Sequence, residues 1–316
     1  MNDRIKHFPI TAYAVIMGLT GLSIVFSKFY HLQWLPKFPF TVLLFFTTAL
    51  FGVISFLYGL KAVHHFENVQ KDFTHRIRVN FFSAISISFL LLSIAYLGYW
   101  PMVALVRWWM GTLLHTVLMF HTITFWIRDN FEIRAMNPAW FIPVVGNILV
   151  PVAGVDFMPA AFSFFYFAVG VFFWLVLFTI FVNRVIFHHQ MPEKFMPTLF
   201  ILLAPPAVGF IAYMRITQSW DVFAALLLFL TYFFVGLLLF LHKSFRGLPF
   251  FISWWAFTFP MMAVTLASAV AYQVTAVALF KYAAWVMSVL ALLMVILVSV
   301  RTIAGIAHHQ ICVNED

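Results

Sequence analysis

The side chains that could carry chemistry in this sequence are few and unevenly placed. Of the 316 residues, 10 are Asp or Glu, and each falls in a connection between apolar runs or at a terminus. Proton-coupled pumps and cation channels usually need a carboxylate at membrane depth, so the sequence offers them little support. Two cations, Arg107 and Lys281, do lie inside apolar runs, each about six residues or roughly 9 Å from one end. With the acids missing, they favour an anionic solute and an electropositive outer entrance, unless they only reach out to the lipid headgroups.

Histidine and cysteine point away from a bound cofactor. His115 and His121 lie in the same apolar run, and no other run has a central histidine. A haem with two histidine ligands needs them on opposite faces of its ring, so packing or hydrogen bonding between helices is the better interpretation. Three His-His pairs stand at the ends of apolar runs, and neighbouring helical residues diverge by about 100°, so we interpret them as interfacial caps instead of metal ligands. The single cysteine, Cys312, excludes an internal disulfide and a thiolate cluster.

No motif for an enzyme is present. The sequence has no G-x-x-x-x-G-K-[ST] phosphate loop and no polar stretch long enough to form a domain that could hold nucleotide. We therefore predict no enzymatic activity, no cofactor and no metal.

The composition indicates a chain that is dissolved in lipid. It is 64% hydrophobic and 9% charged, with a mean hydropathy of +1.01. A soluble domain is about half apolar and a quarter charged. The net charge of +8 could suggest nucleic acid, but in a membrane protein Lys and Arg orient the chain, and we predict no nucleic-acid partner.

Ten apolar runs are long enough to cross a bilayer, which takes about 17–25 residues. They cover residues 9–29, 39–62, 79–98, 101–127, 139–156, 158–187, 195–214, 219–242, 248–272 and 276–306.

The basic residues predict the orientation of these spans. Thirteen Lys and Arg fall on the side that holds the N-terminus, and only Lys28, Lys37 and Arg215 fall in or beside loops on the other side. This asymmetry predicts that both termini are cytoplasmic, which requires an even number of spans. Short outer loops then pair each odd span with the following even one, giving five helical hairpins in a single membrane domain, 1–316.

Odd and even spans differ in composition. The odd spans contain Pro, Gly and Ser, as in "NPAWFIPVVGNILVPVAG" at 137–154, whereas even spans such as "LLLFLTYFFVGLLLFL" are plainly apolar. Proline removes a backbone donor and kinks a helix, and lipid tolerates that defect only where protein or a water-filled cavity satisfies the backbone. The pattern predicts kinked odd helices inside and even helices outside, with the odd ones around a central conduit. These small residues could instead simply permit close helix packing.

Three stretches together, at 137–154, "APPAVGF" at 204–210 and "WWAFTFPMM" at 254–262, resemble the tellurite-resistance/dicarboxylate transporter family. That family includes bacterial TehA proteins, the slow anion channels of plant guard cells, yeast malate permeases and sulfite exporters. The resemblance covers nearly the whole chain. It implies an all-α membrane protein whose five hairpins form a quasi-fivefold ring, one pore per subunit lined by the odd helices, and a homotrimer.

The resemblance also implies particular pore residues. A phenylalanine of the ninth span closes the pore at mid-membrane, and the matching position is Phe259, with Phe257 as the fallback. A ring in a narrow apolar pore excludes water and so blocks ions. Phe259 is also one of 42 phenylalanines, which makes plain packing the alternative. We place the Trp254–Trp255 pair at the membrane interface. The other predicted pore-lining or kink residues are Gly18, Ser86, Asn147, Pro151, Pro206, Phe210 and Pro260.

These observations predict an anion channel of a bacterial inner (plasma) membrane. We expect it to pass small monovalent anions, chloride and nitrate, passively and to be gated by Phe259. The alternative is a secondary transporter of C4-dicarboxylates, sulfite or tellurite in the same fold, which should hold its substrate at a defined polar site. The short supply of central polar residues, essentially Asn147 and the serines of the third span, favours the channel.

Overall fold

The computed structural model describes residues 2–312, with side chains from residue 4, and this part of the chain is helical throughout and has no strand. Nine of its helices are long and apolar enough to cross a membrane. A tenth apolar segment, Pro138–Gly154, is shorter. The chain is thus an all-α, multi-pass membrane protein.

Five long helices form the outside of the molecule, and we call them the outer helices. They are plain α-helices from their first residue, and the buried share of each is only 28–39%. Their exposed side chains are large and apolar, such as Phe56, Phe120 and Phe240, as expected for a surface that faces lipid. The outer helices are α3 (Lys37–His64), α6 (Pro101–Arg128), α9 (Ala160–Phe187), α11 (Val222–Phe240) and α13 (Ala278–Ala307).

Five other segments lie between them, and we call these the inner segments. The four long ones are 72–83% buried, about twice the share of the outer helices. Each begins with a 3-10 helix. They are η1 (Ile10–Ala12) with α2 (Tyr13–His31), η2 (Arg78–Phe82) with α5 (Ser83–Tyr96), the segment Pro138–Gly154, η6 (Glu193–Leu203) with α10 (Ala204–Thr217), and η8 (Ile252–Phe257) with α12 (Thr258–Thr275).

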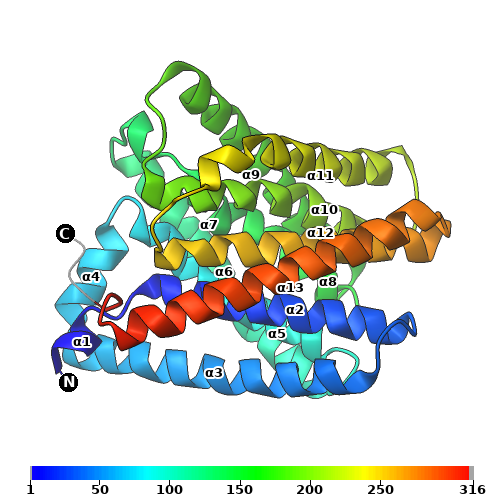
Figure 1. Cartoon of the computed structure of the whole chain (residues 1–316), viewed down its shortest axis with the longest axis horizontal. Coiled ribbons are helices and arrows are strands. Elements are labelled where there is room, and N and C mark those ends of the chain that lie inside the picture. The colour runs from blue at the N-terminus through cyan, green and yellow to red at the C-terminus, as the bar shows by residue number, and fades with distance from the viewer. Residues whose placement is uncertain (1, 313–316) are drawn as a thin grey trace.

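The inner segments contact one another in a closed cycle. Helix α2 contacts α5, α5 contacts α8 (Val150–Gly154), α8 contacts α10, α10 contacts α12, and α12 returns to α2. Each inner segment also contacts the outer helix that follows it in the chain. In Figure 1, α2, α12 and α13 run side by side along the long axis. The predicted division into inner odd and outer even segments is therefore present.

The fifth segment differs from the continuous span expected at 139–156. It consists of η4 (Pro138–Phe141), α7 (Ile142–Val145), η5 (Gly146–Leu149) and α8. The cause is its content of proline and glycine, since proline lacks the donor that a continuous helix needs. The segment still extends about 30 Å. It contains two 3-10 helices of four residues each, which rise about 2.0 Å per residue, and two α-helices of four and five residues, which rise about 1.5 Å per residue. That length matches the bilayer core of about 30 Å.

Five prolines of the inner segments stand in the first turn of an α-helix, whereas Pro138 and Pro197 lie in the 3-10 helices η4 and η6. Pro143 and Pro151 are near the starts of α7 and α8, Pro205 and Pro206 follow the first residue of α10, and Pro260 is the third residue of α12. The first turn has no intrahelical use for the missing donor, so proline is tolerated there. The expected mid-helix kinks are thus replaced by changes from 3-10 to α-helix.

Four short helices, two α and two 3-10, complete the described part of the chain. Helices α1 (Asn2–Lys6) and α4 (Phe66–Thr74) lie at the same end of the molecule as the last residues of α13 (Figure 1). There Arg4 Nη2 lies 3.0 Å from His309 Nε2. The remaining 3-10 helices are η3 (Ile133–Ala135) and η7 (Leu241–Phe245).

Candidate functional site

The inner segments enclose a cavity of about 80 Å³, which we call the central cavity. All five contribute side chains from their N-terminal halves, for example Met17, Ile87, Val145, Ala204 and Phe259. No charged side chain lines it among the residues that the structure describes.

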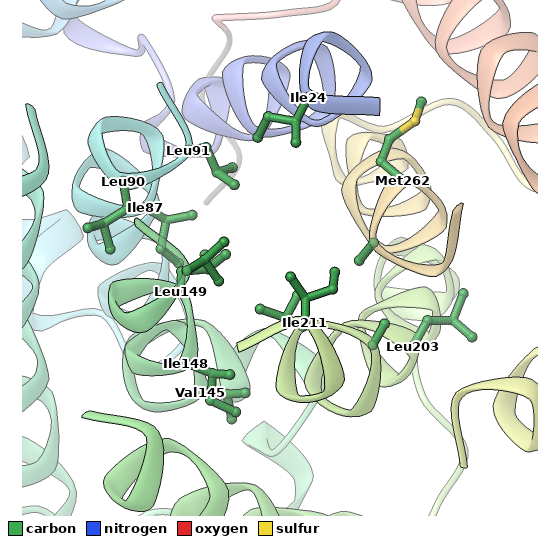
Figure 2. Close-up of a cluster of buried hydrophobic side chains, with 14 of the residues drawn as sticks. Ile24, Ile87, Leu90, Leu91, Val145, Ile148, Leu149, Leu203, Ile211 and Met262 are labelled. Atoms are coloured by element: carbon green, nitrogen blue, oxygen red, sulfur yellow. The ribbon is translucent and has the colours of Figure 1, made fainter. Parts of the chain in front are cut away.

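A second cavity of about 30 Å³, the distal cavity, lies further along the same five segments. Its wall is also apolar and includes Ile24, Ile94, Val152, Ile211 and Leu266. Figure 2 shows Ile24, Leu91, Leu149 and Ile211 pointing from four different segments toward a common centre. The two cavities therefore lie in line within the ring of inner segments.

Three side chains, Phe259, Leu149 and Val208, line both cavities and so stand between them. The ring of Phe259 is half-buried because it borders this open space. It also packs toward Gly21, where an added Cβ would lie 3.4 Å from Phe259 Cδ2. Phe259 is the largest of the three groups that separate the cavities.

Phe257, the fallback position, lies elsewhere. It is 4% exposed and lines neither cavity. Its ring packs edge-on against Phe200 at 4.7 Å and against Trp254 at 5.8 Å between centroids. Its surroundings are those of a packing residue.

Gly18 lies where α2 and α12 approach each other. An added Cβ would lie 2.1 Å from Thr258 Oγ1 and 2.9 Å from Thr258 Cβ, distances that real Cβ atoms do not adopt. The Thr258 hydroxyl is itself fixed, since it donates to Trp255 O at 2.7 Å. Gly18 thus permits close helix packing and does not itself line either cavity.

The predicted polar pore residues find partners away from the cavities. Ser86 Oγ lies 2.8 Å from His115 Nδ1 on α6, which matches the expected hydrogen bonding between helices for that histidine. Asn147 Nδ2 donates to Val144 O at 2.7 Å and to Met119 Sδ at 3.1 Å. Both residues are fully buried and line neither cavity.

Of the remaining predicted pore-lining residues, one lines a cavity and three do not. Pro260 lines the central cavity, and Pro151, Pro206 and Phe210 are buried outside both cavities. The ring of Phe210 packs on Trp220 at 5.9 Å between centroids.

Arg107 and Lys281 lie away from the two cavities. The Arg107 guanidinium stacks over the ring of Tyr96 at 5.0 Å and borders an open groove between α3 and α6. Lys281 Nζ lies 5.5 Å from the ring of Trp34 and 5.8 Å from that of Tyr272. Both cations rest on aromatic faces at the outside of the ring.

Two other cations, predicted from the sequence only to orient the chain, follow the distal cavity directly. Lys28 and Arg215 come four residues after Ile24 and Ile211, which line that cavity, and residues four apart share a helix face. Arg215 donates to Val152 O at 3.0 Å and pairs with Asp156, and Lys28 donates to Gln273. This spacing of four from an inward-facing apolar residue is the signal that could have identified them.

Trp255 contradicts the expected interfacial anchor. It is 2% exposed, lines the central cavity, and donates from Nε1 to Thr302 Oγ1 at 2.9 Å. Trp254 is half-buried and donates to Pro249 O. The two residues differ because η8 turns them to different sides.

The described residues contain no group of three His, Cys, Asp or Glu side chains that could hold a metal ion. The open space within the ring is therefore apolar, divided at Phe259, and followed at its distal end by basic groups. Such an arrangement could pass a solute but has no constellation for bond-making chemistry.

Comparison with known proteins identifies the family. Residues 7–303 match the family described as voltage-dependent anion channel. Over 277 residues the chain is 32% identical to the S-type anion channel SLAH2 of Arabidopsis thaliana, an overlap of 83% of this chain and 52% of that protein.

Microbial relatives match over more of their length. An uncharacterized transporter of Methanocaldococcus jannaschii is 25% identical over 309 residues, or 87% of each chain. The tellurite resistance protein TehA homolog of Haemophilus influenzae is 24% identical over 220 residues, 68% of this chain and 66% of its own. By contrast, the chain spans about half the length of the plant channels SLAH2 and SLAH3.

The resemblance that the sequence motifs indicated is thus confirmed over nearly the whole chain. The protein is no enzyme: it belongs to the voltage-dependent anion channel family, the membrane anion channels and transporters that include the TehA proteins.

Proposed function

We propose that the protein is an anion channel that conducts small monovalent anions, such as chloride and nitrate, passively along the two cavities. In the conformation described here Phe259 closes the path, and its outward movement opens it. The five inner segments form a quasi-fivefold ring around this path.

One observation carries the proposal: Phe259 borders both cavities, and both lie inside the closed ring of inner segments. A phenyl ring in a narrow apolar passage excludes water, and an anion that has lost its water cannot cross the dry constriction. Phe257, two residues earlier, packs among aromatic rings instead.

The chemistry of the walls supports small monovalent ions as the cargo. An apolar lining without charged groups binds an anion weakly, which suits rapid passage. The cost of dehydrating an ion rises steeply with its charge, so a divalent anion faces a much higher barrier in such a passage than chloride. Lys28, whose partner is the neutral Gln273, supplies positive potential at the distal end, which attracts anions, whereas the charge of Arg215 is paired with Asp156.

We further propose that three subunits associate, each with its own path, in a bacterial plasma (inner) membrane with both termini cytoplasmic. The excess of Lys and Arg on the side of the termini supports this orientation.

A secondary carrier is the second candidate, because relatives of this chain are named as a transporter and as a tellurite resistance protein. A carrier for C4-dicarboxylates, sulfite or tellurite should hold its substrate at a polar midplane site. Among the described residues the lining of the two cavities is apolar except for Thr11, Thr198 and Ser253, and the last two already donate to backbone carbonyls, which favours the channel.

The test is planar-bilayer recording of purified protein with chloride, nitrate and malate. The wild type should conduct little, and Phe259→Ala should raise the chloride and nitrate currents on the order of tenfold or more, since each about 1.4 kcal/mol removed from a barrier raises a rate tenfold. Phe257→Ala is the matched control, which should lower stability without raising conductance.

A well-folded Phe259→Ala protein with the conductance of the wild type would overturn the gate. Saturable malate flux that is coupled to a gradient, in the absence of conductance, would establish the carrier instead.

A further inference from the structure

A third cavity, of about 350 Å³, lies at the N-terminal end of the inner segments, and we call it the polar cavity. It is formed by α1, the end of α3, α4, and the starts of four inner segments. Its volume falls within the range of about 300–1,000 Å³ that is usual for small-molecule sites.

The charge of its wall is strongly positive. Five cationic side chains line it, Lys6, Lys61, Lys71, Arg78 and Lys194, against a single carboxylate, Asp72, among the described residues. Such an excess of one sign in a concave surface focuses the potential and raises the local concentration of anions.

The one carboxylate is already bound. Asp72 Oδ2 accepts from Lys61 Nζ at 2.6 Å, and its Oδ1 accepts from Arg78 Nη1 at 3.0 Å. Lys61 also donates to Phe8 O at 2.9 Å, and Lys61 and Asp72 are only 3% and 6% exposed. This buried network fixes α4 against α3 and the N-terminal segment, so the cavity has a rigid floor.

Two amines remain available for a ligand. The ammonium groups of Lys6 on α1 and Lys71 on α4 have no ion-pair or hydrogen-bond partner within the described part of the chain. Several lysines around one space suit an anion with more than one negative charge, since each additional charge finds its own partner.

The polar cavity also adjoins the central cavity. Thr11, Phe81, Ile252 and Ser253 line both, so the two spaces share a wall at the N-terminal entrance of the ring. A ligand in the polar cavity would therefore lie over that entrance.

We propose that the polar cavity is a binding site for a compact, soluble polyvalent anion that carries phosphate or carboxylate groups, and that the bound anion covers the N-terminal entrance. The same charge that favours binding here bars the ligand from the apolar central cavity, where it would lose its water and its partners. The proposed anion binding does not depend on the proposed channel function. Only the proposal that the anion covers the entrance rests on that function.

Isothermal titration calorimetry of the purified protein in detergent tests the binding, with pyrophosphate as the probe in magnesium-free buffer. The wild type should bind with a saturable isotherm that weakens as salt is added. The double variant Lys6→Gln/Lys71→Gln should lose on the order of tenfold or more in affinity, because two charge-assisted contacts are removed. Lys243→Gln removes an exposed lysine of η7 that does not line the cavity, and should bind as the wild type does.

A folded wild type without a saturable isotherm, or a double variant that binds equally well, would overturn the site. So would mass-spectrometric detection of an anionic lipid that stays bound to the wild type and blocks pyrophosphate, because the occupant would then be a lipid headgroup.

Bilayer recording of Phe259→Ala tests the second half of the proposal. Pyrophosphate added on the side of the termini should reduce the current, and addition on the other side should not. If Phe259→Ala carries no current, the channel function fails, and calorimetry still decides whether the site exists. If pyrophosphate reduces the current equally from both sides, the proposal that the bound anion covers this entrance is wrong.

Discussion

Phe257 and Phe259 are two residues apart and receive different surroundings. Phe257 ends η8 and packs on Phe200, whereas Phe259 belongs to the first turn of α12 and borders both cavities. Composition could not separate them, since the chain has 42 phenylalanines. The family motif selected Phe259, and the two cavities now supply an independent physical reason for the choice.

At the same scale we predict that Lys28 contributes to anion selectivity. In a Phe259→Ala background, Lys28→Gln should lower the ratio of chloride to sodium permeability roughly threefold at low salt, because it removes a positive charge from the distal end of the path. The effect should shrink as ionic strength rises. Reversal potentials in salt gradients measure it.

Lys37→Gln is the control for that prediction. Lys37 is exposed at the start of α3, and its ammonium lies over the ring of Tyr99 at 4.8 Å, outside the ring of inner segments. If both variants change the permeability ratio equally, the effect belongs to the general surface charge and not to the path.

Among the contacts between helices, that of α2 with α12 leaves no room for a side chain at Gly18. We predict that Gly18→Ala lowers the melting temperature in detergent by a few degrees, since the new methyl meets Thr258 and overpacking costs about 1–3 kcal/mol. Gly52→Ala is the matched control on α3, where an added Cβ meets nothing within 4 Å. It should be neutral or stabilising, because alanine favours helix by about 1 kcal/mol over glycine.

Equal melting temperatures for the two glycine variants would contradict this view of the α2–α12 contact. Fluorescence-detected thermal unfolding of both proteins in the same detergent decides between the outcomes.

The sequence predicts which elements lie inside but not which of their side chains face the cavities. Proline and glycine are concentrated in the inner segments because lipid does not tolerate the backbone defects they introduce, and serine is found there because small polar side chains face other helices. The polarity of Ser86 and Asn147 suggested a pore lining, yet both pack against neighbouring groups, as buried polar side chains usually do. Which side chains face the cavities depends on the mixture of 3-10 and α turns in each inner segment, and residue types alone do not set that mixture.

At the scale of the whole molecule, the described ends of the chain lie on one side. Arg4 of α1 contacts His309 just after α13, and this requires an even number of crossings. The shorter segment Pro138–Gly154 must then be counted as a crossing beside the nine long helices.

We predict that a membrane-impermeant maleimide labels the only cysteine, Cys312, from the cytoplasmic side alone. Burial raises the pKa of the Cys312 thiol above its usual value, against the opposing effect of Arg4 and Lys61. The thiolate is the reactive form, so its share is small at neutral pH and the labelling rate should rise up to and beyond pH 9. Labelling of inside-out and right-side-out vesicles across this pH range measures both effects.

Ser244→Cys in a Cys312→Ser background supplies the control, because Ser244 is exposed in η7 at the same end. Its labelling should level off at a lower pH. Labelling of Cys312 from outside intact vesicles would reverse the proposed orientation.

The 3-10 helix η8 links helix type to the direction of the Phe259 ring. A residue turns about 120° in a 3-10 helix and about 100° in an α-helix, and it rises about 2.0 Å against 1.5 Å. If one three-residue turn of η8 became α-helical with its start held fixed, everything after it would rotate by about 60° and draw back by about 1.5 Å. The direction of the Phe259 ring between the two cavities is therefore set by the winding of the six residues of η8, four of which line the central cavity.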